Sequence, residues 1–318
     1  MVSQPTVIST FAGCGGSSLG YKLAGFKELL AVEWDDNAVE TFKLNFPGIP
    51  VYHGDIAKLS SCECLKLAGI KKNELDVLDG SPPCQGFSTA GKRNFNDPRN
   101  SLFKEYARLL KELQPKVFVM ENVTGMIKGV MKQAYLVIIK ALRDCGYNVK
   151  GQVLNAMYFN VPQSRERIIL IGVRNDLEIK PSHPKPQGKP ITIKAAFSGI
   201  ILDKNDLKET GLTPLYQKYW HSSKEGKSVG KLAKNKRLNW RKPSHTLQKS
   251  EGNGGAYHPT ECRSLTIKEF KLIQSFPDYF HFVGNRHDAI ERIGNSVPPN
   301  LMKVIAEHIK INILDKIA

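Results

Sequence analysis

The chain has 318 residues, enough for one large domain and a smaller one, and 46 Lys or Arg against 30 Asp or Glu give a formal net charge of +16. This excess favours a polyanionic partner such as nucleic acid, although solubility alone also accounts for a basic surface. No apolar run approaches the roughly 20 residues of a membrane span, and the start of the chain lacks the regions of a signal peptide. Six scattered cysteines without a Cys-x-x-Cys pair argue against a disulfide scaffold and a zinc site. We therefore expect a soluble intracellular protein with reduced thiols and no metal.

Short apolar or β-branched runs alternate with helical patterns over the first 175 residues. The runs predict strands at 7–11, 29–33, 76–78, 116–120, 147–154 and 167–173. Between them, apolar residues at helical spacing predict a helix over 101–113. Such alternation is typical of an α/β fold with a mostly parallel sheet, helices on both faces, and ligands at the carboxyl ends of the strands.

A glycine-rich turn, Phe11-Ala12-Gly13-Cys14-Gly15-Gly16, ends the first predicted strand and opens a helix. The second strand ends in Glu33-Trp34-Asp35, at the spacing where a carboxylate holds ribose hydroxyls in Rossmann-like units. Trp34 could cover an adenine, and Asp55 offers a further acceptor. Ser18 replaces the last glycine of the dinucleotide pattern, so a nucleoside cofactor without pyrophosphate fits better, and a mere tight connection stays the alternative.

The segment Gly80-Ser81-Pro82-Pro83-Cys84-Gln85-Gly86-Phe87-Ser88 follows the third predicted strand. Two prolines fix the backbone before Cys84, and polar groups surround its sulfur, as in the presentation of a reactive thiol. The tripeptide alone leaves a catalytic cysteine and a tight loop open.

The alternation ends near residue 178, where several prolines break it. Residues 178–242 hold 15 Lys or Arg and 5 Asp or Glu, ten of the net sixteen charges, together with Trp220, Trp240, Tyr216 and Tyr219. Basic side chains interleaved with aromatic ones suit a nucleic-acid surface, while a solvated insertion with a small aromatic core is the alternative. Order returns with a predicted helix over 265–275 and a last helix after Pro299.

In chain order, these segments resemble the DNA (cytosine-5)-methyltransferase family, over nearly the whole length. The matching segments lie at 11–16, 33–35, 54–56, 82–88, 97–103, 121–123, 163–167, 263–266, 276–278 and 294–301. The resemblance implies a Rossmann-like S-adenosylmethionine-dependent methyltransferase sheet plus a smaller, irregular target-recognition domain. The domains would span 1–178 (catalytic and cofactor-binding), 179–285 (target recognition) and 286–318 (returning to the first domain).

The resemblance also implies roles for the matched residues. Cys84 would attack C6 of cytosine, Glu121 would hold N3, Arg165 would hold O2, and Arg167 would support them, with a strand-entry salt bridge as its alternative. S-adenosylmethionine, leaving as S-adenosylhomocysteine, would contact Phe11, Gly13, Cys14, Gly15, Gly16, Glu33, Trp34, Asp55, Ile56, Pro83, Leu102, Asn295 and Val297. Because Asn295 is distant in sequence, the last helix must fold back beside the first strand.

Double-stranded DNA is the implied partner, with the target nucleotide flipped out of the duplex. The predicted DNA contacts are Gln85, Ser88, Lys92, Arg93 and Arg99 on a closing loop, and Arg237 and Arg241 in the basic region. Without appended domains, the chain resembles the modification enzyme of a bacterial restriction system, cytoplasmic and nucleoid-associated, monomeric, and sharing its site with a cognate endonuclease without a stable complex. An orphan methylase fits equally.

Three other readings compete. A tRNA cytosine-5 methyltransferase of the same family is disfavoured because the Cys-Phe-Thr tripeptide of that branch is absent. A non-enzymatic DNA-binding protein would be expected to lose Cys84, Glu121 or the glycine turn, and a dehydrogenase has no use for Pro82-Pro83-Cys84-Gln85.

Overall fold

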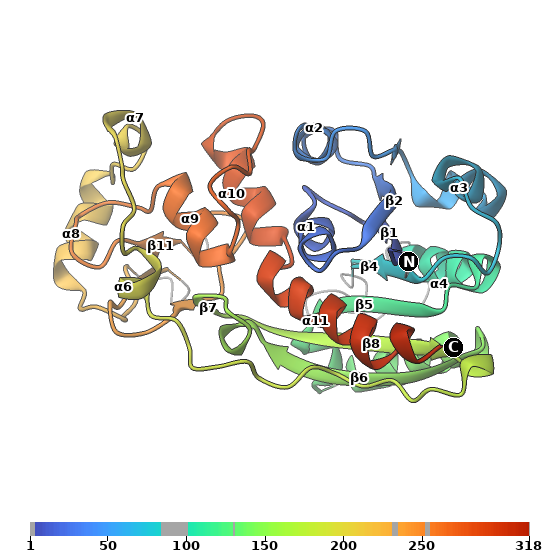
Figure 1. Cartoon of the computed structure of the whole chain (residues 1–318). Coiled ribbons are helices and arrows are strands. Elements are labelled where there is room, and N and C mark those ends of the chain that lie inside the picture. The colour runs from blue at the N-terminus through green and yellow to red at the C-terminus, as the bar shows by residue number, and fades with distance from the viewer. Residues whose placement is uncertain (1–3, 84–100, 130, 231–234, 252–254, 318) are drawn as a thin grey trace.

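A seven-stranded sheet forms the centre of the computed structural model, which describes residues 4–83, 101–129, 131–230, 235–251 and 255–317 (Figure 1). The strand order is β3-β2-β1-β4-β5-β8-β6, and only β8 runs against its neighbours. The expected mostly parallel α/β sheet is therefore confirmed. The strands are β1 (Thr6–Thr10), β2 (Lys27–Glu33), β3 (Val51–His53), β4 (Val77–Gly80), β5 (Val117–Val123), β6 (Tyr147–Asn155) and β8 (Glu166–Arg174).

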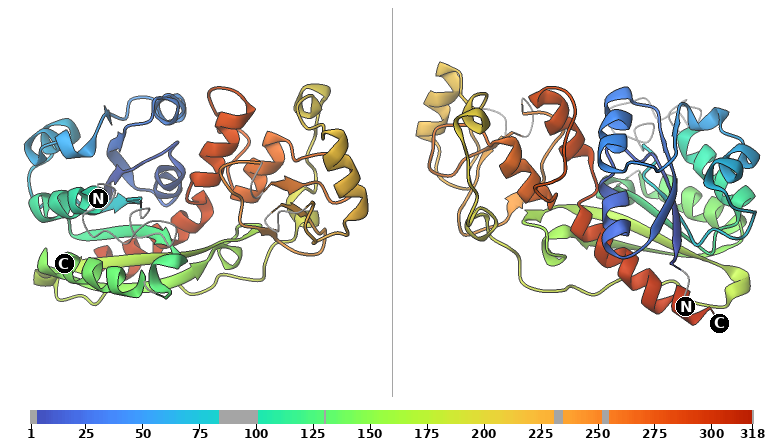
Figure 2. Two further views of the ribbon diagram at one scale, coloured as in Figure 1. Left: turned by 180° about the vertical axis from the view of Figure 1, so that it is seen from behind. Right: turned by 45° about the horizontal axis from the view of Figure 1, so that its top comes forward.

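Helices cover both faces of this sheet, as predicted (Figures 1 and 2). One face packs against α1 (Gly16–Leu23) and α11 (Pro299–Asn312), which also pack against each other, with α2 (Asp36–Asn45) beside them. The other face packs against α3 (Ser61–Ala68), α4 (Ser101–Leu113) and α5 (Met131–Asp144). Alternate strand residues point to opposite faces, so Val7 joins the first core and Ile8 the second.

Helix α4 occupies the predicted range because its apolar residues recur on one side. Tyr106, Leu109, Leu110 and Leu113 are fully buried against the sheet. The Tyr106 hydroxyl lies near the backbone carbonyls of Leu78 and Val119, at 3.3 and 3.2 Å, so its burial leaves no unpaired donor.

The residues between β8 and α11 form a second, irregular part of short elements, on the left in Figure 1. Its helices are α6 (Ile193–Ala196), α7 (Lys204–Leu207), α8 (Pro214–Ser222), α9 (Ile267–Gln274) and α10 (Arg286–Asn295). Its strands are β9 (Lys236–Arg237), β10 (Ser244–His245) and β11 (Ala256–Tyr257), and β10 pairs with β7 (Gln163–Ser164). Single 3₁₀ turns lie at η1 (Ile56–Lys58), η4 (Thr124–Ile127), η5 (Ala156–Tyr158), η6 (Asn175–Leu177) and η7 (Leu314–Lys316).

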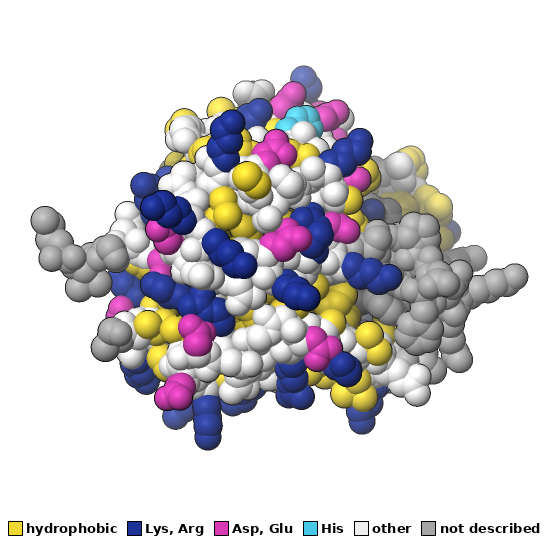
Figure 3. Space-filling view, turned by 90° about the vertical axis from the view of Figure 1, so that its right-hand side faces the viewer, with side chains coloured by type: hydrophobic (Ala, Val, Ile, Leu, Met, Phe, Trp, Pro, Cys, Tyr) yellow, Lys and Arg dark blue, Asp and Glu magenta, His cyan; other side chains and the backbone are white. Residues whose placement is uncertain are grey.

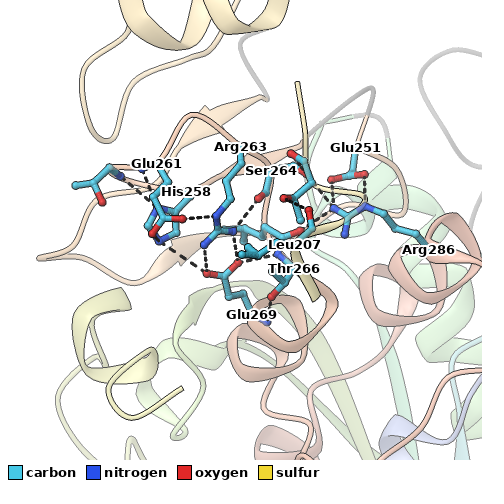
Figure 4. Close-up of polar contacts among 12 residues, drawn as sticks. Leu207, Glu251, His258, Glu261, Arg263, Ser264, Thr266, Glu269 and Arg286 are labelled. Atoms are coloured by element: carbon cyan, nitrogen blue, oxygen red, sulfur yellow. Dashed lines mark hydrogen bonds and ion pairs between the residues drawn. The ribbon is translucent and has the colours of Figure 1, made fainter. Parts of the chain in front are cut away.

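Buried charges organise the irregular part (Figure 4). Arg263 pairs through both terminal nitrogens with Glu269 at 2.8 Å, and its Nε binds Glu261 at 2.6 Å. Glu269 is 1% exposed and also accepts from the backbone of Thr266, which closes a capping box at the start of α9. Removing Arg263 would leave the buried Glu269 charge without its main partner, and removing Glu269 would leave Arg263 with Glu261 as its carboxylate, so this pair fixes α9 against the preceding loop.

The two last α-helices, α10 and α11, pack on different parts of the molecule. In α10, Ile290 and Ile293 belong to a cluster with Ile193, Leu247 and Phe270, whereas α11 packs on the sheet. The domain limits at 178 and 285 stay a prediction.

Basic side chains are not restricted to residues 178–242. Figure 3 shows the end of the molecule farthest from α8, where Lys and Arg side chains are spread among acidic ones.

Candidate active site

The predicted site residues follow strands whose carboxyl ends meet at one edge of the sheet. β1 to β5 run parallel, so the turns after them converge there. β8 runs antiparallel, so its beginning, with Arg165 and Arg167, lies at the same edge, and Arg167 is paired with Val123 in the strand register. The sheet thus brings together segments that are 150 residues apart.

The glycine-rich turn after β1 is fixed to the end of β2. Its backbone takes positive φ at Phe11, Gly13 and Gly15. The Gly13 N–H donates to Glu33 Oε2 at 2.8 Å, while Glu33 Oε1 accepts from the N–H groups of Trp34 and Asp35. Glu33 is therefore held between the two turns, with lone-pair capacity left on Oε2.

The junction of α10 and α11 lies against this turn. A Cβ on Gly16 would overlap Ser296 Oγ and the carbonyl oxygen of Val297, so only glycine permits this approach. The expectation that the last helix folds back beside the first strand is confirmed, because α11 packs against α1. Cys14 points toward α10, where burial raises the pKa of its thiol to about 11, so a cofactor contact would have to come from its backbone.

The other predicted cofactor residues differ in exposure. Trp34 is 77% exposed, an unusual position for an indole. Gly54 donates from its backbone to the Glu33 carbonyl, which places Asp55 beside Glu33. Asp55, Pro83 and Asn295 are exposed, Leu102 is half-buried, and Ile56 and Val297 are buried. An exposed indole, two carboxylates and a glycine-rich turn fit the adenine, ribose and methionine parts of S-adenosylmethionine.

The thiol predicted to attack cytosine lies outside the described residues. Cys84 falls there together with Gln85, Ser88, Lys92, Arg93 and Arg99. The backbone entering the segment is described, and the Asn122 side chain donates to the Pro82 carbonyl at 2.9 Å. Asn122 therefore ties the end of β5 to the approach to Cys84, a role that sequence reasoning missed.

Glu121 and Arg167 form a partly shielded ion pair. Arg167 Nε lies 2.7 Å from Glu121 Oε1, and the two side chains are 14% and 11% exposed. The expectation that Arg167 supports Glu121 agrees with this contact, which is also the salt bridge of the alternative interpretation. The carboxylate is thus oriented by its neighbour.

Arg165 is a buried guanidinium, 2% exposed. Burial first, then the neighbouring charge of Arg167, lowers its pKa to about 9, so it remains cationic at neutral pH. Its Nη1 donates to the Leu247 carbonyl at 3.3 Å, and among the described residues its Nε has no hydrogen-bond partner. A buried donor of this kind suits a ligand oxygen.

Two buried carboxyl groups lie below the glycine turn, between the sheet and α1. Asp79 accepts from the Tyr21 hydroxyl at 3.3 Å, and burial raises its pKa to about 7. Burial, reinforced by the charge of Asp79, raises the pKa of Glu28 to about 8. Neither residue was singled out by the sequence.

The two predicted DNA contacts in the basic region differ. Arg241 is exposed. Arg237 is half-buried: it donates to the carbonyls of Pro259 and Ser223 and lies 3.8 Å above the Trp220 ring. These internal contacts hold the Arg237 guanidinium against Trp220, and its use on DNA stays a prediction.

The described ranges contain neither a candidate metal cluster nor a helix of membrane-spanning character. No group of three or more His, Cys, Asp or Glu there could hold a metal ion. No helix in these ranges is both long and apolar enough to cross a membrane.

The chain is similar to known cytosine-5 methyltransferases over nearly its whole length. The family model "C-5 cytosine-specific DNA methylase" matches residues 5–311. The chain is 35% identical to the Type II methyltransferase M.Eco47II of Escherichia coli, over 98% of this chain and 80% of that protein. It is 34% identical to the Type II methyltransferase M.NgoPII of Neisseria gonorrhoeae, over 96% and 95%.

Solved structures show the same fold. A protein described as a DNA modification methyltransferase from an Escherichia coli prophage superimposes with a TM-score of 0.83 at 25% identity, covering 98% of this chain and all of that one. The Spodoptera frugiperda DNMT2 structure superimposes with a TM-score of 0.72 at 22% identity, covering 97% and 99%, a likeness of fold alone. The chain therefore belongs to the C-5 cytosine-specific DNA methylase family, as a restriction-modification type of DNA cytosine-5 methyltransferase.

Proposed function

We propose that this enzyme transfers a methyl group from S-adenosylmethionine to C5 of a flipped-out cytosine in a short duplex DNA sequence, through a covalent bond between Cys84 and C6. The observation that carries the proposal is the meeting of Glu121, Arg165 and Arg167 with the glycine turn and Glu33 at one sheet edge. Cytosine chemistry and a nucleoside-type pocket would then be adjacent.

C5 of cytosine is a weak nucleophile, so the reaction needs covalent activation. The Cys84 thiolate would add to C6 and push electron density onto C5, which then takes the methyl group. Loss of the C5 proton to a base, for which an ordered water is our candidate, lets the electrons of that bond expel Cys84 and restores the ring. Asn122, through Pro82, would fix the backbone that presents the thiol.

Three ionisable side chains would stabilise the ring while Cys84 is attached. Glu121, oriented by Arg167, would act in its protonated form and donate to N3, and Arg165 would donate from its unpaired Nε to O2. Since Arg165 is buried, its charge would act on O2 with little screening by water.

When bound, S-adenosylmethionine supplies an electrophilic methyl group on a sulfonium. Glu33 and Asp55 would hold the ribose and adenine, Trp34 would cover the adenine, and the backbone at 13–16 would face the methionine part. The turn can do so because Gly13 has open space at its Cβ position.

A cytosine stacked in a duplex cannot reach a site formed by strand ends, so the target base would be extruded. One flipped base needs one site, and a monomer is therefore sufficient. Residues 179–285 would read the DNA sequence.

The test is transfer of labelled methyl from S-adenosylmethionine to unmethylated duplex DNA, with tRNA and the Cys84→Ala variant in parallel. We expect 5-methylcytosine in DNA only and none with the variant. Label in tRNA would move the enzyme to RNA substrates, and activity without Cys84 would refute the covalent mechanism.

A further inference from the structure

Two glutamines with no exposed surface lie between the cytosine side and the cofactor side of the site. Gln163 is on β7, two residues before Arg165, and Gln274 is the last residue of α9. Buried amide groups need hydrogen-bond partners, and in both glutamines the side-chain oxygen accepts and the side-chain nitrogen donates.

The hydrogen bonds of these amides form one chain. Leu247 N–H donates to Gln163 Oε1 at 3.0 Å, Gln163 Nε2 donates to Gln274 Oε1 at 2.5 Å, and Gln274 Nε2 donates to the Ser296 carbonyl at 2.6 Å. Every donor points toward Ser296, an arrangement in which the bonds polarise one another.

Both ends of the chain reach residues of the site. At one end, the carbonyl of Leu247 accepts from Arg165. At the other, Ser296 lies between Asn295 and Val297 and touches the place where Gly16 would carry a Cβ. The backbone of Gln248 also lies against Gly294, where a Cβ would overlap it, so the two ends are packed together as well as hydrogen-bonded.

We infer that Gln163 and Gln274 form a relay of positioning residues, which sets the cytosine-holding Arg165 and the cofactor segment 295–297 in register. This inference rests on the proposed function. Neither glutamine is among the residues proposed to contact the reactants. Because both side chains are fully buried, breaking one hydrogen bond leaves a buried amide or carbonyl group unpaired, and the other bonds of the relay have to rearrange.

In a relay, a change on one side of the site also impairs the other side, which we call a cross-effect. Two independent hydrogen bonds would show no cross-effect. Gln274 contacts the cofactor side, so its loss should also impair chemistry on cytosine. Gln163 contacts the cytosine side, so its loss should also weaken cofactor binding. Local bonds would each affect one side only.

The test compares Gln163→Met and Gln274→Met with the unaltered enzyme in two half-reactions. Binding of S-adenosylhomocysteine, measured by calorimetry, reports the cofactor side. Release of tritium from C5 of cytosine in duplex DNA without S-adenosylmethionine reports the cytosine side, because Cys84 addition, protonation at C5, loss of tritium and elimination of Cys84 require no methyl group.

We expect each variant to lose about tenfold in both assays, the effect of one lost buried hydrogen bond. The double variant should lose less than the product of the single losses, since either change breaks the same chain. A loss confined to one assay for each variant, or simple multiplication, would overturn the relay.

Two further variants guard against a folding defect. Gln163→Glu keeps the acceptor for Leu247 N–H, and since burial favours the protonated carboxyl, its O–H can donate to Gln274 Oε1; this variant should therefore retain both half-reactions, whereas Gln163→Met loses them. Gln114→Met is the matched control: Gln114 donates to the carbonyls of Lys111 and Cys145 at the opposite edge of the sheet, and its loss should leave both assays unchanged.

The unaltered enzyme separates the two hypotheses. If it binds S-adenosylhomocysteine and releases tritium but the variants show no cross-effect, the relay alone is refuted. If it does neither, the proposed function is refuted and the relay with it.

Discussion

Replacing Asp79 by Asn should stabilise the folded enzyme at neutral and alkaline pH. Asp79 is 3% exposed, and burial raises its pKa from 3.8 to about 7. At 1.36 kcal/mol per pKa unit, this shift means that ionisation weakens the folded state by about 4 kcal/mol at high pH. Asn is never ionised and can still accept from Tyr21.

The sign follows from proton binding. Between about pH 4 and pH 7 the folded state retains a proton on Asp79 that the unfolded chain has lost, so this group's contribution to stability falls as pH rises. The advantage of the Asn variant should therefore be near zero at pH 3.5, grow by about 1.4 kcal/mol per pH unit, and level off above pH 7.

Urea unfolding of both proteins between pH 4 and pH 8.5 measures this difference. Asp76→Asn, on the segment leading into β4, is the control of opposite sign, because Asp76 pairs with Lys116 at 2.8 Å and accepts from Thr6. It should lower the free energy of unfolding. A difference between Asp79→Asn and the unaltered enzyme that does not change with pH would refute the reasoning.

Three other changes follow from the same structure. Gly16→Ala should lower the free energy of unfolding by about 2 kcal/mol and weaken S-adenosylhomocysteine binding, because the new Cβ has no room. Gly125→Ala is the control and should change neither, because nothing lies within 4 Å of its Cβ position. Thermal unfolding and calorimetry measure the two effects. Glu269→Ala should lower the free energy of unfolding by about 3–5 kcal/mol, because the terminal nitrogens of buried Arg263 lose their carboxylate and the Nε contact with Glu261 is the ion pair that remains. A loss under about 1 kcal/mol in urea unfolding would contradict this role. Burial lowers the pKa of His183 from 6.5 to about 4, so its contribution to stability is lost as pH falls below 6.5. Between pH 6.5 and pH 5, the free energy of unfolding of His183→Gln should therefore fall by about 2 kcal/mol less than that of the unaltered enzyme. Equal decreases in urea unfolding would contradict the role of His183.

Local patterns predicted most strands of the sheet half, but α2, α3 and α5 were not predicted. Apolar spacing located α4 at 101–113, and β-branched runs located most of the strands, because burial on one or both faces dictates which positions are apolar. α10 was missed, although Asn285 and Asp288 form a capping box that marks its start. β3 and the two-residue strands were also missed, since segments of two or three residues carry no periodicity.

The sequence predicted site residues where the residue type itself is charged or reactive, or where glycine permits an unusual backbone conformation. The glycine turn, Glu33, Glu121 and Arg165 stand out as residues, and strand order brings them to one edge. Nothing in the sequence states that Arg237 donates to the carbonyls of Ser223 and Pro259, because these contacts join segments that are distant in the chain.

The order of motifs along the chain was enough to predict the family, the mostly parallel sheet and the residue types of the site. Only the folded structure shows which groups are buried and paired: Asp79 with its raised pKa, and the amide chain from Leu247 through Gln163 and Gln274 to Ser296. These properties depend on the dielectric environment and on hydrogen-bond partners 22 to 111 residues apart in the chain, distances that periodicity and spacing do not encode.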